Sequence, residues 1–216
     1  MPYYKIKHIL FIHIPKTGGT MLNSLLKKDD IQLIYQEKYN NNIFPPPFDK
    51  YSLQHQFYST IYKYKNLYNL KFNNKLKIIS IVRNPYTRII SDLFWFTKLG
   101  QYNFIKKNYT KEQIYQSIKT YLKMPPQYLD NHNTPQYKYI TDNHDNLISN
   151  IKIFKLENLY KNKENINKYL NCDLNIENLQ MKDYNNYLNK ESINLINTFY
   201  KKDFEIFKYA MNYEYG

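Results

Sequence analysis

Short continuous apolar runs alternate along this chain with segments whose apolar residues recur at helical spacing. This pattern predicts strands and helices in alternation. Three short apolar runs rich in β-branched residues are typical of buried strands: one that ends at Ile14, one at residues 76–82 and one at residues 150–156. Signals that start a helix follow each of them. Strands that alternate with helices predict an α/β fold in which a central parallel sheet is flanked by helices on both faces, in three layers.

The expected helices are marked by their ends as well as by their spacing. Asn84 before Pro85 suits an N-cap followed by the first helical residue, and residues 110–113 form a capping box. Helices are expected from residue 21, from Pro85, over 110–123, over 158–170 and over 190–207. The apolar side chains of the last helix are expected in the core: Ile193, Ile196, Phe199, Tyr200, Phe204 and Phe207.

The loop between the first expected strand and helix holds two of the chain's four glycines. It reads Pro15-Lys16-Thr17-Gly18-Gly19-Thr20. Adjacent glycines let backbone N–H groups approach an anion, the start of a helix favours negative charge, and a lysine adds a positive charge. The loop therefore predicts a phosphate-binding site, with a plain strand-to-helix connection as the alternative.

The order of residues in this loop differs from that of ATP- and GTP-binding loops. Their pattern places the lysine after the glycines, whereas Lys16 comes before Gly18. A kinase or nucleotidase of that class also needs an acidic metal ligand at the end of a later strand. The strand at 76–82 ends in Arg83 instead, so this class is kept only as an alternative function.

A second motif follows the second expected strand. It reads Arg83-Asn84-Pro85-Tyr86-Thr87-Arg88 and continues to Ser91. Ligands bind at the carboxyl ends of parallel strands in open α/β sheets, and Arg83 has that position. Arg88 and Ser91 are about one helical turn apart. Taken singly, the arginine and the serine would equally fit the exposed face of an ordinary helix.

Together the two motifs resemble those of sulfotransferases that use 3′-phosphoadenosine 5′-phosphosulfate (PAPS). The loop at 15–20 resembles the 5′-phosphosulfate loop of that family, and the segment from Arg83 to Ser91 resembles its 3′-phosphate motif. The likeness is closest to the membrane-associated carbohydrate sulfotransferases of the heparan sulfate 2-O-sulfotransferase type, and it spans most of residues 6–210. The resemblance implies a P-loop-like fold and sulfuryl transfer to a hydroxyl, most readily one on a carbohydrate.

The resemblance also implies roles for individual residues. Lys16 would lie against the oxygen that leaves as the bond to sulfur breaks, which stabilises developing charge. The backbone amides of residues 17–20 would hold the 5′-phosphate, and Arg83 and Ser91 the 3′-phosphate. No metal is implied. The residues expected to bind the donor are therefore Pro15, Lys16, Thr17, Gly18, Gly19, Thr20, Arg83 and Ser91.

The acceptor hydroxyl needs a base. His55 lies between the two motifs, where the 2-O-sulfotransferase type has its catalytic histidine, and an imidazole suits proton abstraction at neutral pH. A histidine that only packs is the alternative at this position. Other branches of the family use a glutamate earlier in the chain, a role open to Glu37. His132 and Gln136 faintly resemble a segment that contacts the acceptor.

Length, charge and cysteine content limit the remaining choices. The 216 residues suit a single sulfotransferase domain over 1–216, and the single cysteine, Cys172, excludes an intramolecular disulfide.

The net charge of +13 suggests an anionic partner, or merely a solvated lysine-rich surface. A non-catalytic basic protein that binds a polyanion is therefore a second alternative, although no nucleic-acid motif is present. We see no signal peptide and no apolar span of 18 residues, so we expect a cytoplasmic protein; oligomeric state stays open.

Overall fold

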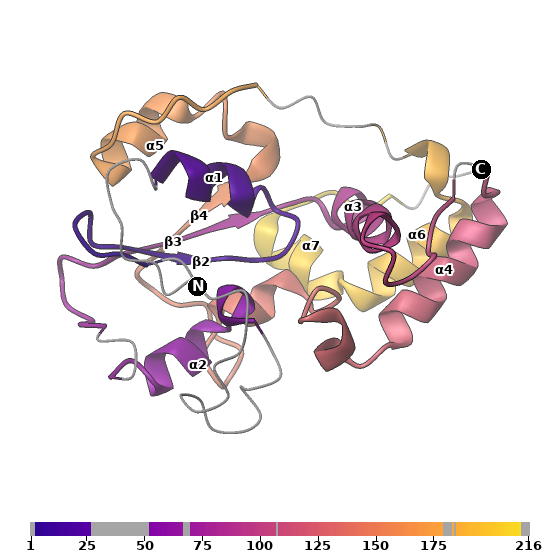
Figure 1. Ribbon diagram of the computed structural model, residues 1–216, viewed down its shortest axis with the longest axis horizontal. Coiled ribbons are helices and arrows are strands. Elements are labelled where there is room, and N and C mark those ends of the chain that lie inside the picture. The colour runs from indigo at the N-terminus through magenta and orange to yellow at the C-terminus, as the bar shows by residue number, and fades with distance from the viewer. Residues whose placement is uncertain are drawn as a thin grey trace. The chain divides into compact units, whose positions relative to one another are not determined.

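A computed structural model describes residues 3–26, 52–66, 70–106, 108–178, 183 and 185–212 of the chain (Figure 1). Contacts divide the chain into two compact units. Unit 1 comprises residues 1–82 and 136–180, and unit 2 comprises residues 83–135 and 181–216. The assignment of one sulfotransferase domain to 1–216 stays a prediction.

Unit 1 is built on a mixed sheet, which has four strands among the described residues. In spatial order these are β1 (Tyr3–Tyr4), β2 (Ile9–Ile12), β3 (Lys77–Val82) and β4 (Ile151–Lys155). β2, β3 and β4 run parallel, with Leu10 opposite Ile78 and Ser80 opposite Ile153, and β1 pairs antiparallel with β2. All four residues of β2 are buried, as expected for an apolar run covered on both faces.

Helices cover both faces of this sheet. In Figure 1, α1 (Gly19–Leu26) and α5 (Lys163–Leu170) lie on one side and α2 (Tyr58–Lys63) on the other. α1 buries Leu22 and Leu26, and the Tyr4 hydroxyl of β1 donates a hydrogen bond to Asn23 Oδ1 at 2.5 Å. Three short 3-10 helices complete the unit: η3 (Leu53–His55), η5 (Gln136–Ile140) and η6 (Leu156–Asn158). The predicted three-layer α/β class with a mostly parallel sheet is confirmed.

Unit 2 is helical in its described residues. Its α-helices are α3 (Pro85–Lys98), α4 (Lys111–Lys123), α6 (Lys190–Phe199) and α7 (Lys201–Phe207), and its 3-10 helices are η4 (Pro126–Leu129) and η7 (Asn185–Tyr187). The helix starts predicted at Pro85 and at the capping box of residues 110–113 are confirmed. The Asn84 side chain accepts a hydrogen bond from Tyr86 N at 2.9 Å, and Thr110 and Gln113 make both bonds of a capping box. The apolar faces of these helices pack into one core.

Three sequence predictions need correction. β4 lies at the end of the described sheet and is only partly buried, so it is not the fully buried strand expected at 150–156. The helix expected at 158–170 begins only at Lys163, because η6 and a turn precede it. The helix expected at 190–207 is two helices that meet at Tyr200, whose φ of −103° and ψ of 22° interrupt the helical path.

The break at Tyr200 changes which side chains face the core. Phe199 is 38% exposed, contrary to expectation, whereas Ile193, Ile196, Tyr200, Phe204 and Phe207 are buried as expected. Within the described ranges, no helix is both long and apolar enough to cross a bilayer.

Candidate active site

The loop after β2 has an unusual backbone path. Lys16 and Gly18 both adopt positive φ angles, of 62° and 88°. Such a conformation costs free energy at a residue with a side chain and is found where the surrounding structure requires it, often at functional sites. Thr17 is fully buried between them, and its hydroxyl donates a hydrogen bond to the Ile14 carbonyl at 2.8 Å. The loop is thus tightly folded, with Lys16 half-buried at its bend.

The two glycines of this loop leave space for neighbouring side chains, and Gly18 also adopts a positive φ. A Cβ on Gly18 would lie 2.6 Å from Leu156 Cδ1, and a Cβ on Gly19 would lie 1.9 Å from His13 Nε2. At either distance the neighbouring side chain would have to move to admit a Cβ. Gly19 is also the first residue of α1, so the loop ends at a helix N-terminus, which carries partial positive charge. Pro15 is buried and Thr20 is exposed.

His55 lies close to this loop through one intermediate ring. The ring centroids of His55 and His13 are 5.1 Å apart in an edge-to-face arrangement, and His13 is the residue packed against Gly19. His55 is 4% exposed, and its Nδ1 is 3.4 Å from the Ser52 hydroxyl. The predicted base and the predicted phosphate loop therefore belong to one unit and are joined by successive contacts.

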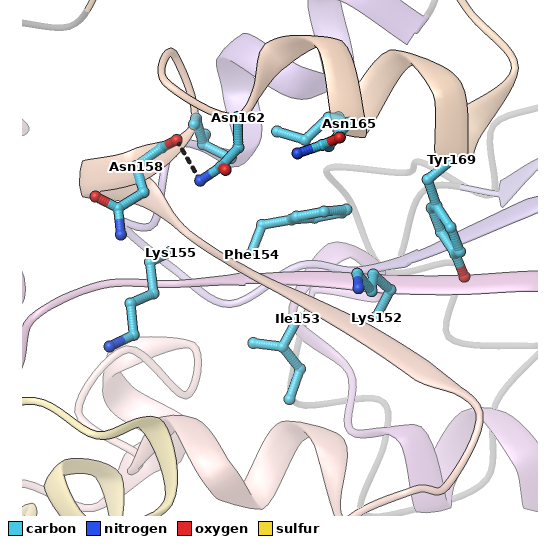
Figure 2. Close-up of a pocket in the computed structure, with 10 residues that line it drawn as sticks. Lys152, Ile153, Phe154, Lys155, Asn158, Asn162, Asn165 and Tyr169 are labelled. Atoms are coloured by element: carbon cyan, nitrogen blue, oxygen red, sulfur yellow. Dashed lines mark hydrogen bonds between the residues drawn. The ribbon is translucent and has the colours of Figure 1, made fainter.

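A cavity of about 480 Å³ lies beside the edge strand of the same unit (Figure 2). Side chains of β4, of η6, of the turn after it and of α5 line the cavity. They include lysines, asparagine amides and two aromatic rings: Lys152, Phe154, Lys155, Asn158, Asn162, Asn165 and Tyr169. Lys155 and Asn158 lie on either side of Leu156, the residue that Gly18 approaches. The residues of the loop at 15–20 do not themselves line the cavity. Cavities of this size accommodate small ligands.

The second motif opens unit 2. Arg83 directly follows the last residue of β3, is 7% exposed, and donates from Nε to Thr87 Oγ1 at 3.0 Å. Ser91 is half-buried on α3. Asn84 caps that helix, so Arg83 is positioned by a strand end on one side and a helix start on the other. The roles of Arg83 and Ser91 in phosphate binding stay predictions.

Arg88, the second arginine of this motif, lies in different surroundings from Arg83. It is 2% exposed, and its guanidinium donates to the carbonyls of His132 and Thr134 at 2.6 and 3.0 Å. Arg88 thus secures the segment that leads to His132 and belongs to the interior of unit 2. Its sequence spacing from Ser91 does not reveal this, because the partners are more than forty residues away.

His132 is held by a fully buried carboxylate. Its Nδ1 lies 2.7 Å from Asp92 Oδ1, and the Tyr121 hydroxyl donates to the other carboxylate oxygen at 2.8 Å. Burial alone would raise the pKa of Asp92, but the adjacent His132 and Arg88 outweigh it and lower that pKa. Burial, and then the Asp92 charge, raise the pKa of Tyr121 well above its ordinary value. The carboxylate therefore remains charged and the phenol neutral.

Two residues that the sequence analysis did not single out are central to this geometry. His13 links the loop to His55, and Asp92 orients His132. His13 was visible as a polar residue at the end of an apolar run, but neither partner is local in sequence. His132 belongs to unit 2 and Gln136 to unit 1. Glu37, the alternative base, and the proline-rich stretch at 40–47 lie outside the described residues.

Comparison with known proteins identifies the family. The sequence profile of the sulfotransferase family matches residues 4–210. A crystal structure of a sulfotransferase from Alicyclobacillus acidocaldarius is similar at 11% sequence identity, with 92% of each chain covered and a TM-score of 0.42. Curated proteins give no significant match. Because the family profile covers nearly the whole chain, including both motifs, the chain belongs to the sulfotransferase family.

Proposed function

We propose that the protein transfers a sulfuryl group from PAPS to a hydroxyl of a carbohydrate acceptor. Membership of the sulfotransferase family supports sulfuryl transfer in general. The donor is proposed from the two motifs: residues 15–20 hold the 5′-phosphosulfate, and Arg83 and Ser91 hold the 3′-phosphate. The tight loop, the positive φ of Lys16 and the helix start at Gly19 support anion binding at the first motif.

His55 is the proposed general base. The observation that carries this role is the contact of His55 with His13, whose ring lies against Gly19 at the start of α1. His55 is therefore close to the loop proposed to hold the sulfuryl group. Its burial limits competition from water, and the Ser52 hydroxyl beside Nδ1 can hold the ring in one orientation.

The proposed reaction is an in-line displacement at sulfur. The acceptor oxygen forms a bond to sulfur as the bond between sulfur and the bridging oxygen of the donor breaks. The acceptor proton passes to the His55 imidazole, and the electron pair of the broken bond stays on the 5′-phosphate of the leaving adenosine 3′,5′-bisphosphate. Lys16 stabilises that developing charge, a type of interaction worth about 3–4 kcal/mol.

The cavity beside β4 supports a carbohydrate acceptor. Asparagine amides both donate and accept hydrogen bonds, as a hydroxyl-rich ligand requires, and Tyr169 adds an aromatic surface beside Lys152 (Figure 2). These lysines and the net charge of +13 favour an anionic glycan. This composition is compatible with the heparan sulfate 2-O-sulfotransferase type, which we propose as the related branch.

Donor binding is tested by a thermal-shift titration with adenosine 3′,5′-bisphosphate, run beside ATP–Mg and AMP. At about 100 times its Kd, a ligand adds about 2.7 kcal/mol to the free energy of unfolding. We expect selective stabilisation by the bisphosphate, weakened in Lys16→Ala and in Arg83→Ala. Stabilisation by ATP–Mg alone would instead support a kinase or nucleotidase, and no response from the folded protein would support a non-catalytic polyanion-binding protein.

Catalysis is tested by transfer of radiolabelled sulfate from PAPS to chemically desulfated heparin. His55→Ala should lower kcat about 100-fold or more while the affinity for adenosine 3′,5′-bisphosphate is retained. His144→Ala is the matched control, because His144 is exposed, lies in the segment 141–149 of unit 1 and has no proposed role. Equal activity of the two variants would reject His55 as the base.

A further inference from the structure

We propose that His13 is a positioning residue that holds the His55 ring in the orientation needed for proton transfer. This inference rests on the proposed function and goes beyond it, because the two motifs and the base assign no role to His13. Three contacts of His13 within unit 1 carry the inference: with the end of β2, with the start of α1 and with His55.

The first contact fixes where His13 leaves the sheet. His13 directly follows Ile12, the last residue of the fully buried β2. The Ser80 hydroxyl of the adjacent β3 donates to the Ile12 carbonyl at 2.8 Å, which secures the end of the strand. The His13 ring stacks on the Phe11 ring, with the centroids 5.4 Å apart and an angle of 22° between the planes. The His13 ring therefore packs against a side chain of its own strand.

The second contact places the ring against α1. His13 Nε2 and Cδ2 would lie 1.9 and 2.1 Å from a Cβ at position 19, so the imidazole occupies the space that a side chain there would need. His13 is 7% exposed. With Phe11 on one side and Gly19 on another, the ring has little room to change its rotamer, because a buried side chain in close packing moves only at the expense of its neighbours.

The third contact is between the rings of His13 and His55. The two imidazole centroids are 5.1 Å apart and their planes are inclined by 65°, an edge-to-face arrangement. The Ser52 hydroxyl lies 3.4 Å from His55 Nδ1. His55 comes from a 3-10 helix of only three residues, whose backbone alone constrains the ring weakly. Contact with the closely packed His13 ring therefore adds a constraint on the orientation of the His55 ring.

His13→Ala and His13→Phe separate this role from a general effect on folding. His13→Ala removes the ring, whereas His13→Phe keeps a flat ring that can still contact His55. We expect kcat with PAPS and desulfated heparin to fall about 100-fold in His13→Ala, the size of loss that a 1 Å misplacement can cause. The KM for PAPS should change less than about 3-fold, and His13→Phe should recover most of kcat. His8→Ala, at the opposite end of β2, is the matched control.

A second readout needs no acceptor. In a protein with 13C-labelled histidine, the His55 ring resonance is assigned by its loss in His55→Gln. We expect this resonance to shift and broaden in His13→Ala but to stay sharp in His13→Phe, with the Kd for adenosine 3′,5′-bisphosphate retained in both. An unchanged His55 resonance in His13→Ala overturns the inference, as does a kcat that falls only in proportion to donor affinity. If the wild-type protein binds no bisphosphate, the proposed function fails, whereas the resonance still tests the contact.

Discussion

Asp92 and His132 form a buried pair inside unit 2, with 2.7 Å between Asp92 Oδ1 and His132 Nδ1. Because the lowered pKa of Asp92 keeps it ionised and a carboxylate only accepts, the proton lies on His132 Nδ1. The Tyr121 hydroxyl satisfies the second carboxylate oxygen, and Arg88 contributes a compensating charge. This network connects α3 with α4 and with the segment at 130–135, and its disruption has measurable consequences.

Asp92→Asn should destabilise the protein by about 3–5 kcal/mol at pH 7, because it leaves the buried Arg88 without its compensating charge. Urea unfolding measures this difference. Glu205→Gln is the control, since its carboxylate is exposed and its interaction with Lys201 spans 3.8 Å, and it should change the free energy of unfolding by less than about 1 kcal/mol. Similar losses in free energy of unfolding in the two variants would contradict a stabilising role for the buried Asp92 carboxylate.

The Asp92 contribution should also depend on pH. The pKa of Asp92 is lower in the folded protein than its ordinary value of 3.8, so its stabilisation is complete well above pH 4 and is lost as the pH falls through the folded pKa. The difference in free energy of unfolding between wild type and Asp92→Asn should therefore narrow as the pH is lowered from 6 towards 3. A constant difference in free energy of unfolding between pH 6 and pH 3 would show that the Asp92 charge does not cause the stabilisation.

Tyr121 should make the protein sensitive to alkali. Burial raises the pKa of its phenol well above the ordinary value of 10.0, so the stabilisation is present below pH 10 and is lost as the pH rises towards the folded pKa. Tyr121→Phe removes the ionisable group together with the hydrogen bond to Asp92. We expect this variant to be less stable at pH 7, with a flatter decline in Tm above pH 10 than the wild type; parallel declines would contradict the prediction.

Gly19→Ala should reverse the usual effect of this substitution in a helix. Replacing glycine by alanine normally stabilises a helix by about 0.5–1 kcal/mol. Here the new Cβ would lie 1.9 Å from His13 Nε2, so the ring must move, and overpacking of this kind costs about 1–3 kcal/mol. Thermal unfolding of the wild type and of Gly19→Ala measures whether the substitution raises or lowers the stability. Gly100→Ala is a useful comparison, because position 100 has free space around it and only a φ of 70° opposes the alanine.

Lys16→Gly and Lys16→Ala should have the same activity but different stabilities. Both remove the ammonium group, so both should lower kcat about 100-fold or more if Lys16 stabilises the leaving group. Only glycine adopts the φ of 62° without strain, so Lys16→Gly should be more stable than Lys16→Ala by about 1 kcal/mol. A Lys16→Gly variant with wild-type kcat would remove Lys16 from the proposed mechanism.

The sequence predicted well those features that depend on neighbouring residues. The apolar runs that became β2 and β3, the cap at Asn84 and the capping box at Thr110 are all local, because strand burial and helix ends are set within a few positions. The two-helix break at Tyr200 was missed, since the apolar spacing continues across it. Tyr200 is instead held by its own environment: its hydroxyl donates to the Asn133 carbonyl at 3.0 Å.

Contacts between distant segments could not be predicted from periodicity. His13 approaches His55, and Asp92 approaches His132, across forty or so residues in each case. The sequence indicated that His55 and His132 were worth attention, but their immediate partners depend on tertiary packing. The close approach of Gly18 to Leu156 is similar: adjacent glycines suggested anion binding, and the packing requirement became visible only when β4 was placed beside β3.

The two units are each assembled from two separate stretches of chain, and this has a consequence for biosynthesis. The chain passes from unit 1 into unit 2 at Arg83, returns at Gln136 and passes into unit 2 again at Met181. On the ribosome, β3 therefore emerges well before its partner β4, and an unpaired strand edge invites aggregation until it is covered. The core of unit 2 can be completed only later, when α6 and α7 have been synthesised. Nascent chains should thus need protection by a chaperone until translation is nearly complete.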